Sequence, residues 1–186
     1  MNVRMEPLDA IPPWTRAIHG HFRARDHNQH FPGAQRIAWL RHPVQRVVSE
    51  YEHHRRRTDP YNRLAGFVGR GASLREFAEH PAARNTQTRM LDGLPLSAFA
   101  FVGISECLDD ELPRLARATG LKLPGGRWSN PNPAKEKLAA YDLAPDVYDL
   151  ILELNREDVA LYERACAGAT AAPVTRSMVF EPSGQA

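Results

Sequence analysis

The feature that most constrains the fold is the stretch of residues 36–51, RIAWLRHPVQRVVSEY. It opens with a short, continuous apolar run that then stops, which is typical of a buried strand. Pro43 follows at what would be the first turn of a helix, where the missing N–H of proline has no intrahelical partner to lose. Four apolar residues then recur at the i, i+3, i+4 and i+7 spacing of a helix with one buried face: Val44, Val47, Val48 and Tyr51. The stretch therefore predicts a strand that ends on Arg41 and leads directly into a helix.

The rest of the chain repeats this order of elements. A second continuous apolar run, residues 97–104, predicts another strand. A helix is expected after it, with acids early and arginines late, ending at Gly120. We further expect a short strand at 15–22, a loop over 64–73, a helix capped by Ser73 with Glu76, helical turns within 83–91 and one long helix over 145–167. Strand, helices, strand and helix in this order predict an α/β fold with parallel strands.

Length and composition limit the broad class. The 186 residues fit one domain, 1–186, with an irregular arm at 1–17 and a flexible tail at 171–186. No apolar run approaches a membrane span and the N-terminus lacks the apolar core of a secretory signal, so we expect a cytoplasmic protein without a membrane partner. A net charge of +2 is too small for a general nucleic-acid binder.

Cysteine and histidine spacings predict no metal site. Cys107 and Cys166 lie far apart in the sequence and form neither a disulfide framework nor a metal-binding pattern. The histidines of residues 19–30 fit no familiar zinc spacing, and no cysteine or acid is placed to complete a ligand set. We therefore expect no metal cofactor.

Arg41 and Ser49 are candidates for binding an anion. Ligands of open α/β sheets bind beyond the carboxyl ends of the strands, where Arg41 is expected. Ser49 comes six residues after Pro43, about 9 Å along the helix axis. A guanidinium and a hydroxyl that converge on one anion suit a phosphate monoester. The alternative is that Arg41 caps a carbonyl or pairs with Glu50 or Glu52, and that Ser49 is a solvated helix residue.

Residues 41–51, RHPVQRVVSEY, resemble the 3′-phosphate-binding motif of sulfotransferases that use 3′-phosphoadenosine-5′-phosphosulfate. The likeness is to the carbohydrate branch, which includes heparan sulfate 2-O-sulfotransferase. Further stretches resemble segments of the same family in the same order: IHGHF at 18–22, RNTQTRML at 84–91, FVGISECLDDELPRL at 101–115 and LAPDVYDLILELNREDVALYERA at 143–165. The resemblance covers roughly residues 18–165.

The resemblance implies a three-layer, parallel-sheet nucleotide-binding fold of sulfotransferase/P-loop type. It implies transfer of a sulfuryl group from the nucleotide donor to a hydroxyl of a carbohydrate or small-molecule acceptor. Arg41 and Ser49 would hold the 3′-phosphate, and Lys135 of the late loop would also contact the nucleotide. His21, the second histidine of His-Gly-His, would be the base for the acceptor hydroxyl, with His19 assisting.

One family element has no counterpart in the sequence. The family carries an N-terminal phosphosulfate loop, a Gly/Ser/Thr-rich turn with a lysine that leads into a helix. Here the first glycine is Gly20 and the first lysine is Lys122. We therefore expect the fold to be N-terminally incomplete: the chain is a fragment, another polypeptide supplies the loop, or the protein is a degenerate relative. A non-catalytic nucleotide- or anion-binding module and a structural partner protein remain alternatives to an enzyme.

Overall fold

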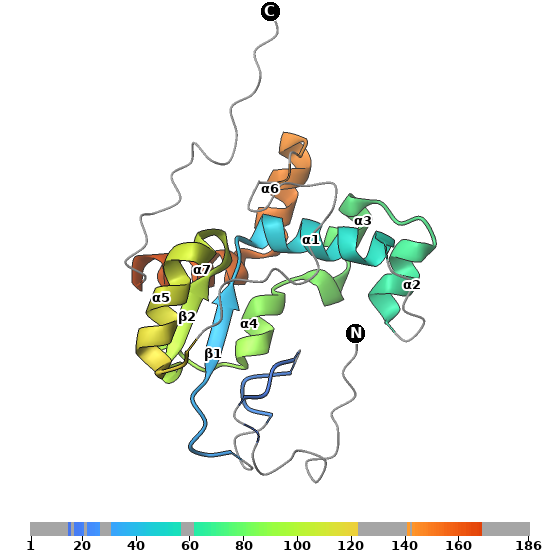
Figure 1. Ribbon diagram of the computed structural model, residues 1–186. Helices are drawn as coiled ribbons and strands as arrows, with labels where there is room; N and C mark the ends of the chain where they lie inside the picture. The colour runs from blue at the N-terminus through green and yellow to red at the C-terminus, as the bar shows by residue number, and fades with distance from the viewer. Residues whose placement is uncertain are drawn as a thin grey trace, which may run out of the picture.

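The computed structural model describes residues 15, 17–20, 22–26, 31–56, 62–122, 141 and 143–168. These residues form an α/β arrangement in which two short parallel strands are accompanied by helices (Figure 1). Strand β1 (Ile37–Leu40) runs parallel to β2 (Phe101–Ile104), with Ile37 opposite Phe101 and Leu40 opposite Ile104. The predicted α/β class, both apolar strands and their parallel pairing are confirmed, although β2 is shorter than the predicted run 97–104.

The described residues also form seven α-helices. They are α1 (Pro43–Arg56), α2 (Arg63–Gly69), α3 (Leu74–Glu79), α4 (Thr86–Leu91), α5 (Leu108–Thr119), α6 (Pro145–Leu154) and α7 (Arg156–Gly168). Short 3-10 turns lie at Pro81–Ala83, Leu96–Ala98 and Ser105–Cys107. The expected arm at 1–17 falls mostly, and the expected tail at 171–186 entirely, outside the described residues.

Local signals of helix starts and ends are confirmed at three places. Pro43 is the first residue of α1, as its missing N–H favours. Ser73 caps α3 in a capping box, because its side chain accepts from the Glu76 backbone N–H while the Glu76 carboxylate accepts from the Ser73 backbone N–H. Gly120 ends α5 with a left-handed φ of 70°, a conformation that glycine adopts without strain.

Three local predictions are wrong. The glycine-containing stretch 64–73 was expected to be a loop, but its first half is α2, which Asn62 caps by accepting from two backbone N–H groups. The described residues of 15–22 form no strand. The expected long helix over 145–167 is two helices, since α6 ends at Leu154 and α7 begins at Arg156. Asn155 stands between them.

The hydrophobic core has two clusters that meet at the turn from β1 to α1. The first gathers buried residues of α1, α2, α3 and α6 and of the adjoining turn: Val44, Val47, Val48, Leu64, Val68, Phe77, Ala78, Ala83 and Ile151. The second gathers buried residues of both strands, α4 and α7: Leu40, Leu91, Ile104, Leu161, Tyr162 and Ala165. Leu40 thus belongs to one cluster and Val44 to the other. The connecting residues, Arg41 to Pro43, are held at both ends by buried side chains.

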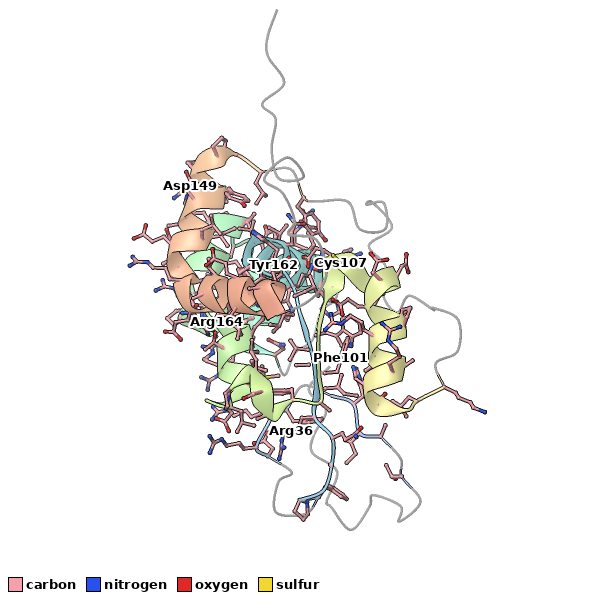
Figure 2. The ribbon with its side chains drawn as sticks, turned by 90° about the vertical axis from the view of Figure 1, so that its left-hand side faces the viewer. Arg36, Phe101, Cys107, Asp149, Tyr162 and Arg164 are labelled. Atoms are coloured by element: carbon pink, nitrogen blue, oxygen red, sulfur yellow. The ribbon has the colours of Figure 1, made fainter. Side chains whose placement is uncertain are left out.

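The two faces of β2 are covered by different helices. Figure 2 shows α5 and α7 on opposite sides of this strand. Phe101 lies under the guanidinium of Arg114 from α5, 5.2 Å from its ring centroid, whereas Val102 packs in the cluster that contains Ala165 from α7. Within the described residues, no helix combines the length and the apolar character needed to cross a lipid bilayer.

Candidate functional site

Arg41 directly follows β1 at the carboxyl end of the parallel pair, as predicted. Its side chain is half-buried, and its guanidinium forms no ion pair with any residue that the structure describes. The two acids considered as its partners pair elsewhere: Glu50 contacts Arg46 at 2.6 Å and Glu52 contacts Arg55 at 3.0 Å. Among the described residues, this guanidinium therefore has no carboxylate within ion-pair distance.

The backbone at this end of β1 is held by side chains. The Arg41 N–H donates to Oε1 of Gln87 at 2.7 Å, and Nε2 of Gln87 donates to the Arg41 carbonyl at 2.9 Å. The next N–H, that of His42, donates to Oε1 of Glu106 at 2.9 Å. The hydrogen bonds of the Arg41 and His42 backbone with Gln87 and Glu106 fix the backbone position from which the Arg41 side chain extends.

Asp158 fixes Gln87 in turn. This carboxylate is fully buried on α7, and it accepts from the Gln87 N–H at 3.1 Å and from the Thr88 N–H at 2.7 Å. The Thr88 hydroxyl also donates to it, at 2.8 Å. An anion at a helix N-terminus satisfies N–H groups that have no partner within the helix and faces the positive end of the helix dipole. Nε of Arg46 lies 3.7 Å from the same carboxylate, so a full positive charge also faces Asp158.

Two asparagines complete the connection between α4 and the α6–α7 turn. The Asn85 N–H donates to the Asn155 side chain at 2.9 Å, and the Asp158 N–H donates to the Asn85 side chain at 3.3 Å. Asn85 has a left-handed φ of 46°, which asparagine tolerates better than most residues. Asn155, fully buried, also donates to the Ile151 carbonyl at 2.8 Å. These bonds link the turn between α6 and α7 to the start of α4.

Sequence reasoning did not single out Gln87, Asn155 or Asp158, although the sequence contains a signal for two of them. Asn155 follows the buried Ile151 by four residues, and Asp158 precedes the buried Leu161 by three. Both therefore lie on the apolar stripe of the 145–167 stretch. A polar residue on such a stripe must be hydrogen-bonded when buried, and so it points to a specific partner elsewhere in the chain.

His42, next to Arg41, lies between two tyrosines. Its ring stacks on Tyr148 with centroids 6.2 Å apart and meets Tyr162 edge-on at 5.5 Å. Burial lowers the pKa of His42, because the imidazolium form loses its hydration there. Burial likewise raises the pKa of Tyr162, whose hydroxyl donates to Glu106 at 3.4 Å. His42 is thus packed as a mainly neutral aromatic side chain.

Ser49 lies on α1, half-buried, four residues after Gln45 and so on the same face of the helix. Oε1 of Gln45 accepts from the backbone N–H of Tyr141, which places the chain before α6 against this face. Arg41 therefore lies two residues before α1, and Ser49 lies on one flank of the same helix. That they converge on one anion stays a prediction.

Of the remaining predicted site residues, the structure describes His19. His19 is exposed and lies in no regular element, whereas His21 and Lys135 fall outside the described residues. After His19 the chain reaches the far end of α4, where the Ala24 N–H donates to the Met90 carbonyl at 2.8 Å. Arg41 instead contacts the first turn of α4. Among the described residues, no group of three or more His, Cys, Asp or Glu side chains is arranged to hold a metal ion, and both cysteines are free.

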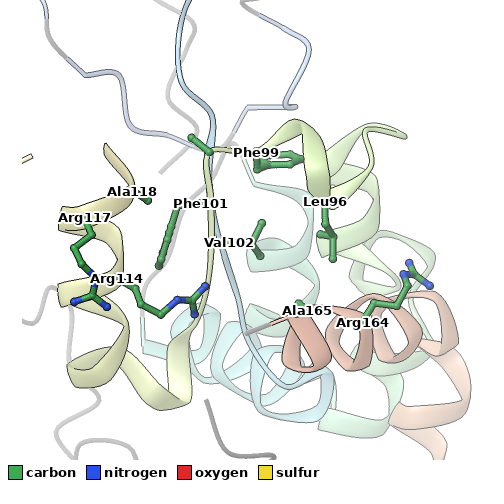
Figure 3. A pocket seen from close by; sticks show the side chains of 11 residues that line it. Leu96, Phe99, Phe101, Val102, Arg114, Arg117, Ala118, Arg164 and Ala165 are labelled. Carbon is green, nitrogen blue, oxygen red and sulfur yellow. The ribbon is translucent and has the colours of Figure 1, made fainter. Parts of the chain in front are cut away.

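A separate cavity of about 510 Å³ lies along β2, between α5 and α7 (Figure 3). Apolar side chains and three arginines line it, and one of these, Arg114, pairs with Glu111 at 2.6 Å. The cavity lies beside the amino-terminal half of β2, at Phe101 and Val102, whereas Leu40 and Arg41 are at the opposite end of the sheet. Because parallel sheets bind ligands beyond their carboxyl ends, the surroundings of Arg41 are the better candidate site.

Comparisons of the chain with protein-family models, with curated proteins and with solved structures find no match. The family resemblance therefore rests on the order and spacing of the short stretches quoted above. The function has to be inferred from these stretches together with the geometry around Arg41.

Proposed function

We propose that the chain is a sulfotransferase-type protein that binds the 3′-phosphate of 3′-phosphoadenosine-5′-phosphosulfate at Arg41 and transfers the sulfuryl group to a hydroxyl of a carbohydrate or small-molecule acceptor. One observation carries the proposal: at the carboxyl end of a parallel strand, Arg41 has a fixed backbone and a guanidinium with no ion-pair partner among the described residues. The same arginine opens the stretch that resembles the family's 3′-phosphate motif.

The start of α1 supports the binding of an anion beside Arg41. This helix has 14 residues and no acid in its own first turn, although the Glu106 carboxylate accepts from the His42 N–H just before it. Its first turn begins with Pro43, and the N–H groups of Val44 and Gln45 have no partner within the helix. Such groups and the positive end of the helix dipole attract phosphate. Arg41 would add a charged, two-pronged donor, which matches the geometry of phosphate oxygens.

The other roles follow the family resemblance. Ser49 would donate its hydroxyl to the same phosphate, and Lys135 would contact the nucleotide. His21 would remove the proton of the acceptor hydroxyl during the in-line displacement, with His19 assisting. The full fold would be the three-layer parallel sheet of this family. The parallel pairing of β1 and β2, with α5 and α7 on opposite sides of β2, is compatible with it.

Calorimetric titration with adenosine 3′,5′-bisphosphate tests the proposal. The wild type should bind, and Arg41→Ala should bind about 10- to 100-fold more weakly, the effect of losing a charge-assisted hydrogen bond to phosphate. Ser49→Ala should lose less, because its hydroxyl is a neutral donor. Arg117→Ala, which removes an exposed arginine beside the separate cavity, is the matched control and should bind like the wild type. Equal affinity for wild type and Arg41→Ala would remove the assignment of Arg41.

Catalysis needs a second measurement. A donor-dependent transfer assay over a panel of hydroxyl acceptors should show turnover that His21→Ala abolishes. Binding of the bisphosphate without turnover, also in a chain extended at its N-terminus, would favour the non-catalytic nucleotide-binding module. Absence of any nucleotide binding would favour the structural partner protein.

A further inference from the structure

We infer that Gln87 is a positioning residue of the anion site, which acts by holding the backbone of Arg41 as a neighbouring strand would. The inference rests on the proposed function, since it assigns to Gln87 a role in binding the 3′-phosphate through Arg41. It concerns a residue on α4, 46 positions further along the chain, whose side chain bonds the Arg41 backbone.

The Gln87 side chain supplies backbone hydrogen bonds just beyond the last residue pair of β1 and β2. The last pair of the sheet is Leu40 with Ile104, so Arg41 lies one residue beyond it. In the view of Figure 1, α4 lies on the other side of β1 from β2. From there, the Gln87 amide accepts from the Arg41 N–H at 2.7 Å and donates to its carbonyl at 2.9 Å. Both backbone groups of Arg41 are thereby satisfied by one side chain.

The pairing needs an amide side chain. Asn and Gln carry a planar donor and acceptor side by side, like a peptide group, whereas a carboxylate lacks the donor and an ammonium group lacks the acceptor. Gln87 is buried, with 9% of its surface exposed, so water does not readily take its place. Without the amide, the N–H and carbonyl of Arg41 would each lose a partner in a half-buried position, and the turn into α1 would be free to shift.

Gln87 is itself fixed to the core. Its backbone N–H donates to Asp158, which is fully buried on α7 and also accepts from Thr88. Polar contacts thus run from α7 through the first turn of α4 to the backbone of Arg41. The arrangement leaves the guanidinium available, because only backbone atoms of Arg41 are used.

Precise placement matters for a two-pronged contact with phosphate. Such a contact requires the guanidinium plane to be within about 0.5 Å and 10–20° of its productive position. We expect Gln87→Met, which has a similar volume but no hydrogen bonds, to bind adenosine 3′,5′-bisphosphate about tenfold more weakly, because the contact is misplaced but not removed.

The test separates positioning from stability. Ser73→Ala is the matched control, because it removes the capping hydrogen bond of α3 and so lowers stability without touching Arg41, Gln87 or Asp158. Both variants should be less stable in urea, but only Gln87→Met should bind the bisphosphate more weakly when titrated at a temperature where both are folded. Equal affinity of Gln87→Met and the wild type would overturn the inference and leave Gln87 a purely structural residue.

A double-mutant cycle tests the route. If Gln87 acts through Arg41, then Gln87→Met should weaken binding about tenfold in the wild type and hardly at all in the Arg41→Ala background. An equal loss in both backgrounds would mean that Gln87 acts by another route, and the inference would fail. A wild type that does not bind the bisphosphate would refute the proposed function itself, which distinguishes the two failures.

Discussion

Replacing Asp158 by Asn tests the polar network that holds α4 and, through it, Arg41. The substitution keeps the shape of the side chain but removes its charge and turns one oxygen into a donor. If the remaining oxygen stays with Thr88, the new NH₂ group faces the Gln87 N–H and the positively charged Arg46. A buried donor left without a partner costs about 1–3 kcal/mol, and the bonds to Thr88 lose their charge assistance. We therefore expect a loss of about 2–4 kcal/mol in the free energy of unfolding.

Urea denaturation followed by circular dichroism measures this loss. With a denaturant slope of about 2 kcal/mol per molar urea, the midpoint of Asp158→Asn should fall by about 1–2 M. Asp149→Asn makes the same chemical change on the exposed surface of α6 and should stay within about 0.5 kcal/mol of the wild type (Figure 2). Thr88→Val should fall between them, near 1 kcal/mol. If the two Asp→Asn variants were equally stable, the reasoning about the buried carboxylate would be refuted.

Three further predictions concern other parts of the fold. Gly103→Ala should destabilise the fold by about 1–3 kcal/mol and lower its melting temperature, because a Cβ there would lie 2.6 Å from the Trp39 ring. The control Gly69→Ala, whose Cβ would have nothing within 4 Å, should be neutral or stabilising. Equal melting temperatures of the two variants would contradict this. Burial lowers the pKa of His42, so the unfolded chain takes up a proton there first as the pH falls through about 6.5, and stability should drop. His42→Gln should reduce the stability difference between pH 7.5 and 5.5; an unchanged difference would exclude His42 as its source. Ser73→Ala should cost about 1 kcal/mol in urea, through loss of the α3 cap, and a cost near zero would argue against the capping box.

The sequence predicted the part of the candidate site that depends on neighbours in the chain. Three local patterns each have a direct physical cause: the apolar run that precedes Arg41, the proline in the first helical turn, and the i, i+3, i+4 spacing of the valines in α1. The strand end and the start of α1 therefore lie where expected. The alternative pairing of Arg41 with Glu50 or Glu52 was not distinguishable by spacing, because the choice depends on which other arginines lie nearer to those acids.

The stretch 64–73 shows where local rules give the wrong answer. Its glycines favour a loop, since each weakens a helix by up to about 1 kcal/mol relative to alanine. In the structure, Leu64, Ala65 and Val68 are buried, and Leu64 and Val68 join the first core cluster, while Asn62 satisfies the first N–H groups of α2. Burial of apolar side chains outweighs helix propensity here. This gain depends on residues of α1 and α3, which local patterns do not include.

The polar network shows a different limit. Asn155 and Asp158 are visible in the sequence as polar interruptions of an apolar stripe, and Asn155 marks the turn that divides the expected helix. Their partners Asn85, Gln87 and Thr88 lie about 70 residues earlier in the chain. Local patterns do not tell which donors a buried carboxylate will meet. The contact between Gln87 and Arg41 could therefore be recognised only in three dimensions.

The most direct measurement of the central claim compares two nucleotides that differ only in the 3′-phosphate. Adenosine 3′,5′-bisphosphate and adenosine 5′-monophosphate should be titrated by calorimetry into the wild type and Arg41→Ala. The wild type should prefer the bisphosphate by about tenfold or more, and Arg41→Ala should lose that preference. A wild type that binds both nucleotides equally, or an Arg41→Ala variant that still prefers the bisphosphate, would contradict the placement of the 3′-phosphate at Arg41.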